Sequence, residues 1–261
     1  DTDEKINNDG TIKFESVKQA VEFKNVWFAY KDEHFVLKDV SFSIKAGQTV
    51  ALVGATGAGK STIINLLSRF YELNKGLILI DGIDIRKIDL VTLRKNTGVV
   101  LQDVYMFNDT LLNNITLNNP DIKFEDVVSA TKQIGLYEYV MSLPDGFDYK
   151  VTERGQGLSA GQRQMLAFIR AFVYQPSIFI LDEATATIDT QTEQLIQKAA
   201  EKISEGRTSI IIAHRLSTIK HVDKIFVFAH GKIIEEGTIQ QLLGSDSKFK
   251  KLYELNNTVE I

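Results

Sequence analysis

The order of apolar and polar residues predicts an open sheet whose strands alternate with helices. Apolar residues stand among polar neighbours at Val21, Phe23, Val26 and Phe28, and again within residues 36–44. This alternation is typical of antiparallel strands with one covered face. Residues 49–53 are instead apolar after the first position and are followed by glycine. They predict a buried strand that enters a tight loop.

Short apolar runs and segments of helical periodicity then follow one another. Strands are expected at residues 77–80, 98–101, 178–181, 209–213, 225–228 and 232–234. Helices are expected at residues 63–70, 124–134, 160–173, 192–203 and 248–255, where apolar residues recur three or four positions apart. This order favours an α/β fold with a mainly parallel sheet.

The same pattern divides the chain into parts. Residues 1–20 are polar and are interpreted as a linker or tail. The domain itself is expected over residues 21–261. Residues 21–102 and 174–261 form its core, which includes an N-terminal antiparallel β subdomain. Residues 103–173 are rich in helical patterns without a clear strand, and are interpreted as an inserted α-helical subdomain.

Composition removes several classes of function. The chain has no cysteine, which excludes disulfides, cysteine-based zinc sites and a thiol nucleophile. Its formal net charge of −4 disfavours binding of nucleic acid over the whole surface. No apolar run approaches the roughly 18 residues that span a bilayer, and the polar start is unlike a signal peptide. The first residue is not Met, which favours a piece of a longer protein.

Residues 54–61 carry the most informative local motif. They read Gly-Ala-Thr-Gly-Ala-Gly-Lys-Ser and fit the P-loop pattern G-x-x-x-x-G-K-[ST]. Glycines allow backbone N–H groups to surround phosphates, and the helix that follows presents its N-terminus to the same anion. Lys60 is expected to reach the β- and γ-phosphates, and the Ser61 hydroxyl to bind Mg²⁺. The expected nucleotide site comprises Gly54, Ala55, Thr56, Gly57, Ala58, Gly59, Lys60, Ser61 and Thr62.

Eight matching positions between a strand and a helix disfavour the alternative, a glycine-rich turn that binds nothing. A P-loop also needs an acidic group for its metal. Asp182 and Glu183 end the apolar strand at residues 178–181, where ligands of open α/β sheets bind. Asp182 is expected to hold Mg²⁺ and Glu183 to polarise the attacking water as a general base. Two surface acids at a strand end would be the bland alternative, and the P-loop disfavours it.

Leu158, Ser159, Ala160, Gly161 and Gln162 resemble the signature segment Leu-Ser-Gly-Gly-Gln of ATP-binding cassette (ABC) transporters. The resemblance to their nucleotide-binding domain covers essentially residues 21–255. It implies an ATPase in which the signature segment covers the γ-phosphate of ATP held by a second domain. The implied unit is therefore a head-to-tail dimer with two ATP at its interface. A serine before small residues and a helix N-terminus suits an anion, although Ser159 is equally a good N-cap.

Ala160 departs from the usual glycine of that signature. Its methyl group stands where backbone should approach phosphate, so it either reduces turnover or is neutral. Any effect of Ala160 is expected at the site of the partner, which this signature segment would cover. This chain's own site retains Glu183 and His214 and is therefore expected to be complete.

Four more residues gain roles through the resemblance. It implies that Tyr30 stacks on adenine, that Gln102 contacts Mg²⁺ and the attacking water, that His214 contacts the γ-phosphate, and that Asp189 reaches across the dimer. Three of them have a simple structural alternative: Tyr30 as a surface tyrosine, His214 as a structural histidine, and Asp189 as an N-cap. Gln102 also implies a link to transmembrane partners, with the apolar segment at residues 104–107 as a docking surface.

Residues 152–155, Thr-Glu-Arg-Gly, resemble a segment that contacts the membrane domains of exporters. The resemblance implies transmembrane domains on the same full-length chain, at the cytoplasmic face of a plasma or inner membrane, and a soluble fragment without nucleic-acid partners. Two ATPases remain as alternatives: an importer subunit, and a soluble protein of DNA repair or translation. The latter predicts a second cassette, a coiled-coil insertion or a basic stripe, none of which is visible. A regulator that does not hydrolyse is disfavoured by Glu183 and His214.

Overall fold

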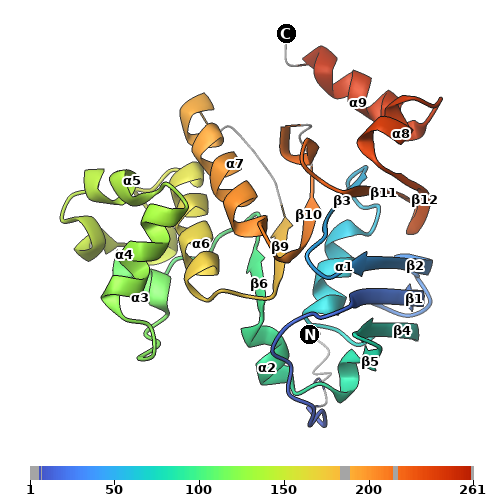
Figure 1. The fold of residues 1–261 in the computed structure, drawn as a ribbon, viewed down its shortest axis with the longest axis horizontal. Coiled ribbons are helices and arrows are strands. Elements are labelled where there is room, and N and C mark those ends of the chain that lie inside the picture. Colours follow the sequence, from blue (N-terminus) through green and yellow to red (C-terminus); the bar gives the residue numbers. More distant parts are fainter. Residues whose placement is uncertain (1–5, 7, 183–188, 214–216, 260–261) are drawn as a thin grey trace.

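The computed structural model describes residue 6 and residues 8–182, 189–213 and 217–259 (Figure 1). Its central sheet has the order β12–β11–β3–β10–β9–β6. These strands are β3 (Thr49–Gly54), β6 (Thr97–Val100), β9 (Ile178–Asp182), β10 (Thr208–Ile212), β11 (Lys224–Ala229) and β12 (Lys232–Gly237). All neighbours pair in parallel except β11 and β12. The predicted mainly parallel sheet is therefore confirmed.

A second, antiparallel sheet has the order β2–β1–β4–β5 and lies to the right in Figure 1. Its strands are β1 (Ala20–Phe28), β2 (Leu37–Lys45), β4 (Lys75–Ile80) and β5 (Ile83–Asp84). In β2, Val40, Phe42 and Ile44 are buried while Ser41 and Ser43 are exposed, as the alternating pattern predicts. The Phe42 ring packs on Phe226 of β11 at 5.0 Å between centroids, which joins this sheet to the central one.

Helices cover both faces of the central sheet. They are α1 (Lys60–Leu67), α2 (Leu90–Lys95), α3 (Leu111–Thr116), α4 (Phe124–Gln133), α5 (Tyr137–Ser142), α6 (Ala160–Val173), α7 (Thr190–Ser204), α8 (Ile239–Leu243) and α9 (Lys248–Val259). Short 3₁₀ turns add η1 (Ile85–Lys87), η2 (Gly146–Asp148), η3 (Glu153–Gly155) and η4 (Ser217–Ile219). Among the described residues, none of the helices has the length and apolarity that a membrane span requires.

The strand period of two divides the buried residues into two cores. Phe179 and Leu181 of β9 face the helices α3, α4, α6 and α7 in one core. Ile178 and Ile180 face the opposite side, where α1 and the antiparallel sheet pack. The helical subdomain, on the left of Figure 1, is thus continuous with one face of the sheet.

Three features depart from the sequence analysis. Residues 103–173 contain the short strands β7 (Asp109–Thr110) and β8 (Lys150–Val151), which pair with each other but are too short to give a hydrophobic period. The helix expected at residues 63–70 ends at Leu67, and Phe70 is 46% exposed. In addition, the segment interpreted as a linker or tail packs on the domain over residues 8–19, and Gly10 and Phe14 are buried there.

Candidate functional site

The P-loop connects β3 to α1 by a backbone path that only glycine can follow at two points. Gly54 has φ 148°, and a Cβ on it would lie 2.2 Å from the carbonyl oxygen of Phe228. Gly59 is the N-cap of α1 with φ 104°, and a Cβ there would lie 2.7 Å from Leu37. Because glycine has no side-chain oxygen, this cap leaves the first N–H groups of α1 available to an anion.

Lys60 folds back over this loop. Its Nζ donates to the carbonyls of Gly54 at 2.7 Å and Ala55 at 3.0 Å, and the side chain is buried. Burial lowers the pKa of Lys60, and the nearby carboxylate of Asp182 acts in the opposite direction. The ammonium group therefore lies inside the loop and close to the acid at the end of β9, with a third N–H to offer.

Three of the residues predicted to bind a metal are described: Asp182, Ser61 and Gln102. Asp182 is the last residue of β9 and pairs with Ile212 of β10. Ser61 is exposed in the first turn of α1. Glu183 and His214 lie outside the described residues, so their proposed roles rest on the sequence.

Tyr30 lies beside α1. Its hydroxyl is 3.2 Å from the hydroxyl of Thr62 and accepts a hydrogen bond from the Asn65 side chain at 2.9 Å. The ring meets Phe28 and Tyr71 edge to face, at 4.7 and 4.9 Å between centroids. Tyr30 nevertheless stays 45% exposed, so the ring is held in place and keeps surface for a ligand.

Tyr71, which is also 45% exposed, was not identified from the sequence. The adjacent aromatic pair Phe70 and Tyr71 was the available signal.

Gln102 lies in a second part of the site. It lines a cleft of about 580 Å³ together with Tyr105, Arg154 and Ala160. The backbone N–H of Arg154 donates to the carbonyl of Met106 at 3.1 Å and ties residues 152–155 to this segment. Gln102, the segment that resembles an exporter motif and the start of α6 thus share one cleft.

The N-terminus of α6 is closed by its own side chains. The Ser159 hydroxyl accepts from the N–H of Gln162 at 3.2 Å, and the Gln162 side chain accepts from the N–H of Ser159 at 2.8 Å. This reciprocal pair is a capping box. Leu158 is buried, and its carbonyl accepts from Arg163 at 2.6 Å. Ala160 is exposed and lines the cleft.

Asp189 caps α7. Its carboxylate accepts from the N–H of Thr192 at 2.9 Å, which lowers the pKa of Asp189. The N-cap function that the sequence left open is therefore present, and a role across a dimer stays a prediction.

The structure thus brings together Tyr30 with Thr62 and Lys60 with Asp182, and separately Gln102 with Ala160. Among the residues described, it records no hydrogen bond or ion pair between residues 158–162 and the P-loop. The geometry is that of a phosphate site and a distinct helix N-terminus on one chain.

A sequence model of a protein family, described as ABC transporter, matches residues 37–186 of this chain. The chain belongs to the ABC transporter family. An ATP-dependent lipid A-core flippase of Legionella pneumophila (strain Paris) is 48% identical over 248 residues, which are 95% of this chain and 42% of that protein. A putative multidrug export ATP-binding/permease protein of Bacillus subtilis (strain 168) is 44% identical over 94% of this chain and 43% of its own length.

A solved bacterial Atm1-family ABC exporter with ATP bound has the same fold as this ABC chain. The TM-score is 0.87 at 40% identity, over 94% of this chain and 43% of that one. This ABC chain therefore spans less than half the length of the relatives it matches. The predicted fold and the prediction of an ABC ATPase domain are confirmed.

Proposed function

We propose that this domain binds and hydrolyses ATP to drive export through transmembrane domains. The observation that carries the proposal is the P-loop, where an N-terminus without a side-chain cap and the buried Lys60 converge. A helix N-terminus and a cation together favour the polyphosphate of ATP. The named relatives are exporters and a flippase, which supports export rather than the importer or soluble alternatives.

The adenine end of ATP is assigned to Tyr30. Its hydrogen bonds to Thr62 and Asn65 fix the ring next to the helix that begins in the P-loop. An exposed, fixed aromatic ring suits stacking with a purine base. The phosphates are assigned to the N–H groups of residues 54–62 and to Lys60.

The residues at this site fit Mg²⁺. That ion prefers oxygen ligands, and it is usually held by one or two carboxylates together with substrate phosphates and water. Ser61 offers a hydroxyl in the first turn of α1, and Asp182 offers a carboxylate beside Lys60. Gln102 is proposed to contribute its side-chain oxygen. Bound Mg²⁺ neutralises charge on the phosphates.

Hydrolysis itself is assigned to four residues, of which Glu183 and His214 are known from the sequence alone. Glu183 is proposed to accept a proton from the attacking water, which Gln102 orients. Lys60 and His214 are proposed to stabilise negative charge on the transferred phosphoryl group.

A second copy, or a related domain on another chain, is proposed to complete the site head to tail. The exposed Ser159 and the N-terminus of α6 support this, because they lie on the surface and suit an anion. Leu158, Ser159, Ala160, Gly161, Gln162 and Asp189 are the residues proposed to cover the partner's ATP.

Coupling to transmembrane domains is assigned to the cleft beside Gln102. Tyr105 and Phe107 are 53% and 51% exposed and stack edge to face at 5.1 Å, which supports an apolar docking surface. A domain docked in this way is proposed to lie at the cytoplasmic face of a membrane.

The test compares ATP hydrolysis by the unaltered chain and Glu183→Gln over a range of protein concentrations. The variant is expected to bind ATP but to hydrolyse it roughly 10²-fold or more slowly, because the general base is lost. Specific activity of the unaltered chain is expected to rise with concentration. Near-normal turnover by the variant contradicts the role of Glu183, and constant activity of a proven monomer contradicts the shared site.

A further inference from the structure

Residues 8–19, here called the N-terminal arm, have a built seat on the domain. The backbone of Ile12 pairs with the segment around Ile88: its N–H donates to the carbonyl of Lys87 at 3.1 Å, and its carbonyl accepts from Asp89 at 2.8 Å. Phe14 is buried, and its N–H donates to the hydroxyl of Thr92 at 3.1 Å. The arm thus docks on η1, α2 and the turn between them.

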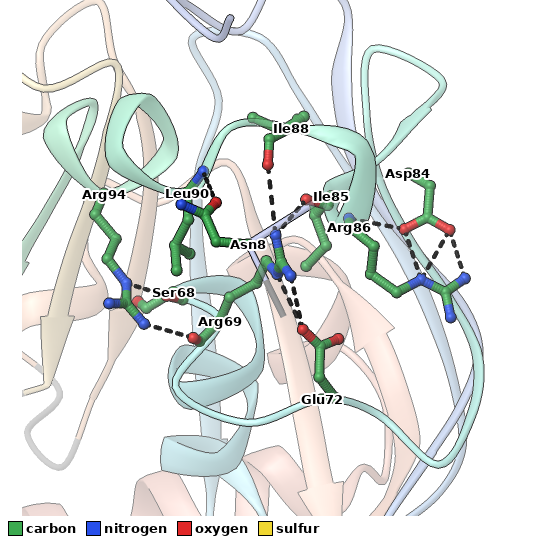
Figure 2. A network of polar contacts seen from close by, with 10 residues as sticks. All are labelled: Asn8, Ser68, Arg69, Glu72, Asp84, Ile85, Arg86, Ile88, Leu90 and Arg94. Carbon is green, nitrogen blue, oxygen red and sulfur yellow. Dashed lines mark hydrogen bonds and ion pairs between the residues drawn. The ribbon is translucent and has the colours of Figure 1, made fainter. Parts of the chain in front are cut away.

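The same segment is also bonded to the residues that follow α1, as Figure 2 shows. Arg69, two residues after α1, is 1% exposed. Its guanidinium donates to the side chain of Glu72 at 2.8 Å and to the carbonyls of Ile85 and Ile88 at 3.3 and 3.4 Å. In the other direction, Arg94 of α2 donates to the carbonyl of Arg69 at 2.6 Å and to that of Ser68 at 3.2 Å.

The arm and Arg69 meet at one carbonyl group. Gly10 packs so closely that a Cβ on it would lie 2.1 Å from the carbonyl oxygen of Ile88. The same oxygen accepts from Arg69. Any side chain at Gly10 must therefore either lift the arm or displace the Ile88 carbonyl, to which Arg69 is bonded.

We propose that Arg69 is a positioning residue of the nucleotide site, through which docking of the N-terminal arm sets the affinity for ATP. The proposal rests on the function assigned above. Since α1 is a single helix of eight residues, a shift of one end is expected to reach the other. Lys60 stands at one end, and the carbonyls held by Arg94 and the side chain of Arg69 stand at the other. The docked arm fixes the segment to which Arg69 is bonded, and thereby fixes the helix that presents its N-terminus to phosphate.

The first test measures the dissociation constant for ATP in EDTA, where hydrolysis does not proceed. Gly10→Ala is expected to bind ATP roughly five- to tenfold more weakly, the lower part of the usual range for coupling between sites. The matched control is the exposed neighbour, Thr11→Ala, which is expected to bind as tightly as the unaltered chain. Hydrogen exchange at the amide of Asp89 reports docking of the arm, and a melting temperature for each variant reports the fold.

The second test asks whether the effect passes through Arg69. Arg69→Lys keeps the charge but loses the planar fork that reaches Glu72 and both carbonyls, so it is expected to weaken ATP binding as well. In the double variant, Gly10→Ala is expected to add little to Arg69→Lys, because both break the same connection. ATP binding is the deciding measurement, since a purely structural role lowers the melting temperature only.

The outcomes separate the inference from the function on which it rests. Equal affinity of Gly10→Ala and the unaltered chain overturns the inference, whatever the exchange rate at Asp89. Strictly additive effects of the two substitutions overturn the route through Arg69. If the unaltered chain binds no ATP, the proposed function fails and the inference fails with it. The inference is supported if Gly10→Ala binds ATP more weakly and if its effect does not add to that of Arg69→Lys.

Discussion

The helices α1 and α6 begin in opposite ways. The N-cap of α1 is Gly59, which has no side chain, while the N-cap of α6 is Ser159, and both hydrogen bonds of its capping box are formed. An uncapped N-terminus leaves N–H groups unsatisfied unless water or a ligand binds them. At the N-terminus of α6, the side chains of Ser159 and Gln162 already accept hydrogen bonds from two of these backbone N–H groups. The difference indicates that α1 is built around its ligand, whereas α6 is stable without one.

The two helices also differ in the groups that their N-termini can offer to a phosphate. At α1, a buried cation lies within the P-loop itself. At α6, the Ser159 oxygen already accepts a hydrogen bond, but among the described residues no acceptor is recorded for its proton. A serine hydroxyl can accept and donate at once. Capping α6 and contacting a partner's phosphate are therefore compatible roles for Ser159.

The largest effect is expected at α1. Lys60→Ala removes the cation from the P-loop, and we expect ATP to bind about a hundredfold more weakly, since hydrogen bonds to charged groups are worth roughly 1.5–3 kcal/mol and two phosphates lose their partner. Calorimetric titration with ATP measures this. Lys45→Ala removes an exposed lysine of β2 and serves as the control. Unchanged binding by Lys60→Ala would show that α1 is not built around a phosphate.

Giving α1 the kind of cap that α6 uses is the second test. Gly59→Ser places a side chain at φ 104° and 2.7 Å from Leu37, so we expect a loss of roughly 1–3 kcal/mol of folding stability. Urea unfolding measures it. Gly82→Ser is the matched control, because Gly82 has φ 77° but no atom within 4 Å of the added Cβ. An equal loss in both variants would assign the effect to backbone strain alone and remove the role of Leu37.

At α6 the comparison is sharpened by a pair of variants. Ser159→Asn and Ser159→Asp both preserve an N-cap oxygen, so both are expected to unfold at nearly the same urea concentration as the unaltered chain. The aspartate adds a negative charge where a partner's γ-phosphate is proposed. We therefore expect the aspartate variant to hydrolyse ATP at least roughly tenfold more slowly than the asparagine variant. A tenfold difference corresponds to about 1.4 kcal/mol of repulsion between the carboxylate and the phosphate. Equal rates would argue that this N-terminus does not meet a phosphate.

The sequence predicted the features that follow from local patterns. The buried strands and the P-loop were found because a run of apolar residues before Gly54 has few other interpretations. The seat of the N-terminal arm was not found, since it depends on backbone bonds from Ile12 and on the close approach of Gly10 to Ile88. Such contacts leave no hydrophobic period. Tyr71 was missed for a related reason, because its neighbour Tyr30 is 41 positions away in the chain.

The smallest effect is expected at a third N-terminus, that of α7. Asp189 caps this helix with a charged group, and the N–H of Thr192 holds the pKa of Asp189 below its ordinary value of 3.8. The charge therefore stabilises the fold above that pH, and its contribution is lost as the pH falls through the lowered pKa. Asp189→Asn keeps a cap without the charge. We expect the unaltered chain to melt slightly higher than Asp189→Asn at pH 6, and the difference to shrink as the pH falls below 3.8 and through the lowered pKa of Asp189. A difference that persists at low pH would mean that Asp189 stabilises α7 through its shape and hydrogen bond, as Ser159 does at α6, and not through charge.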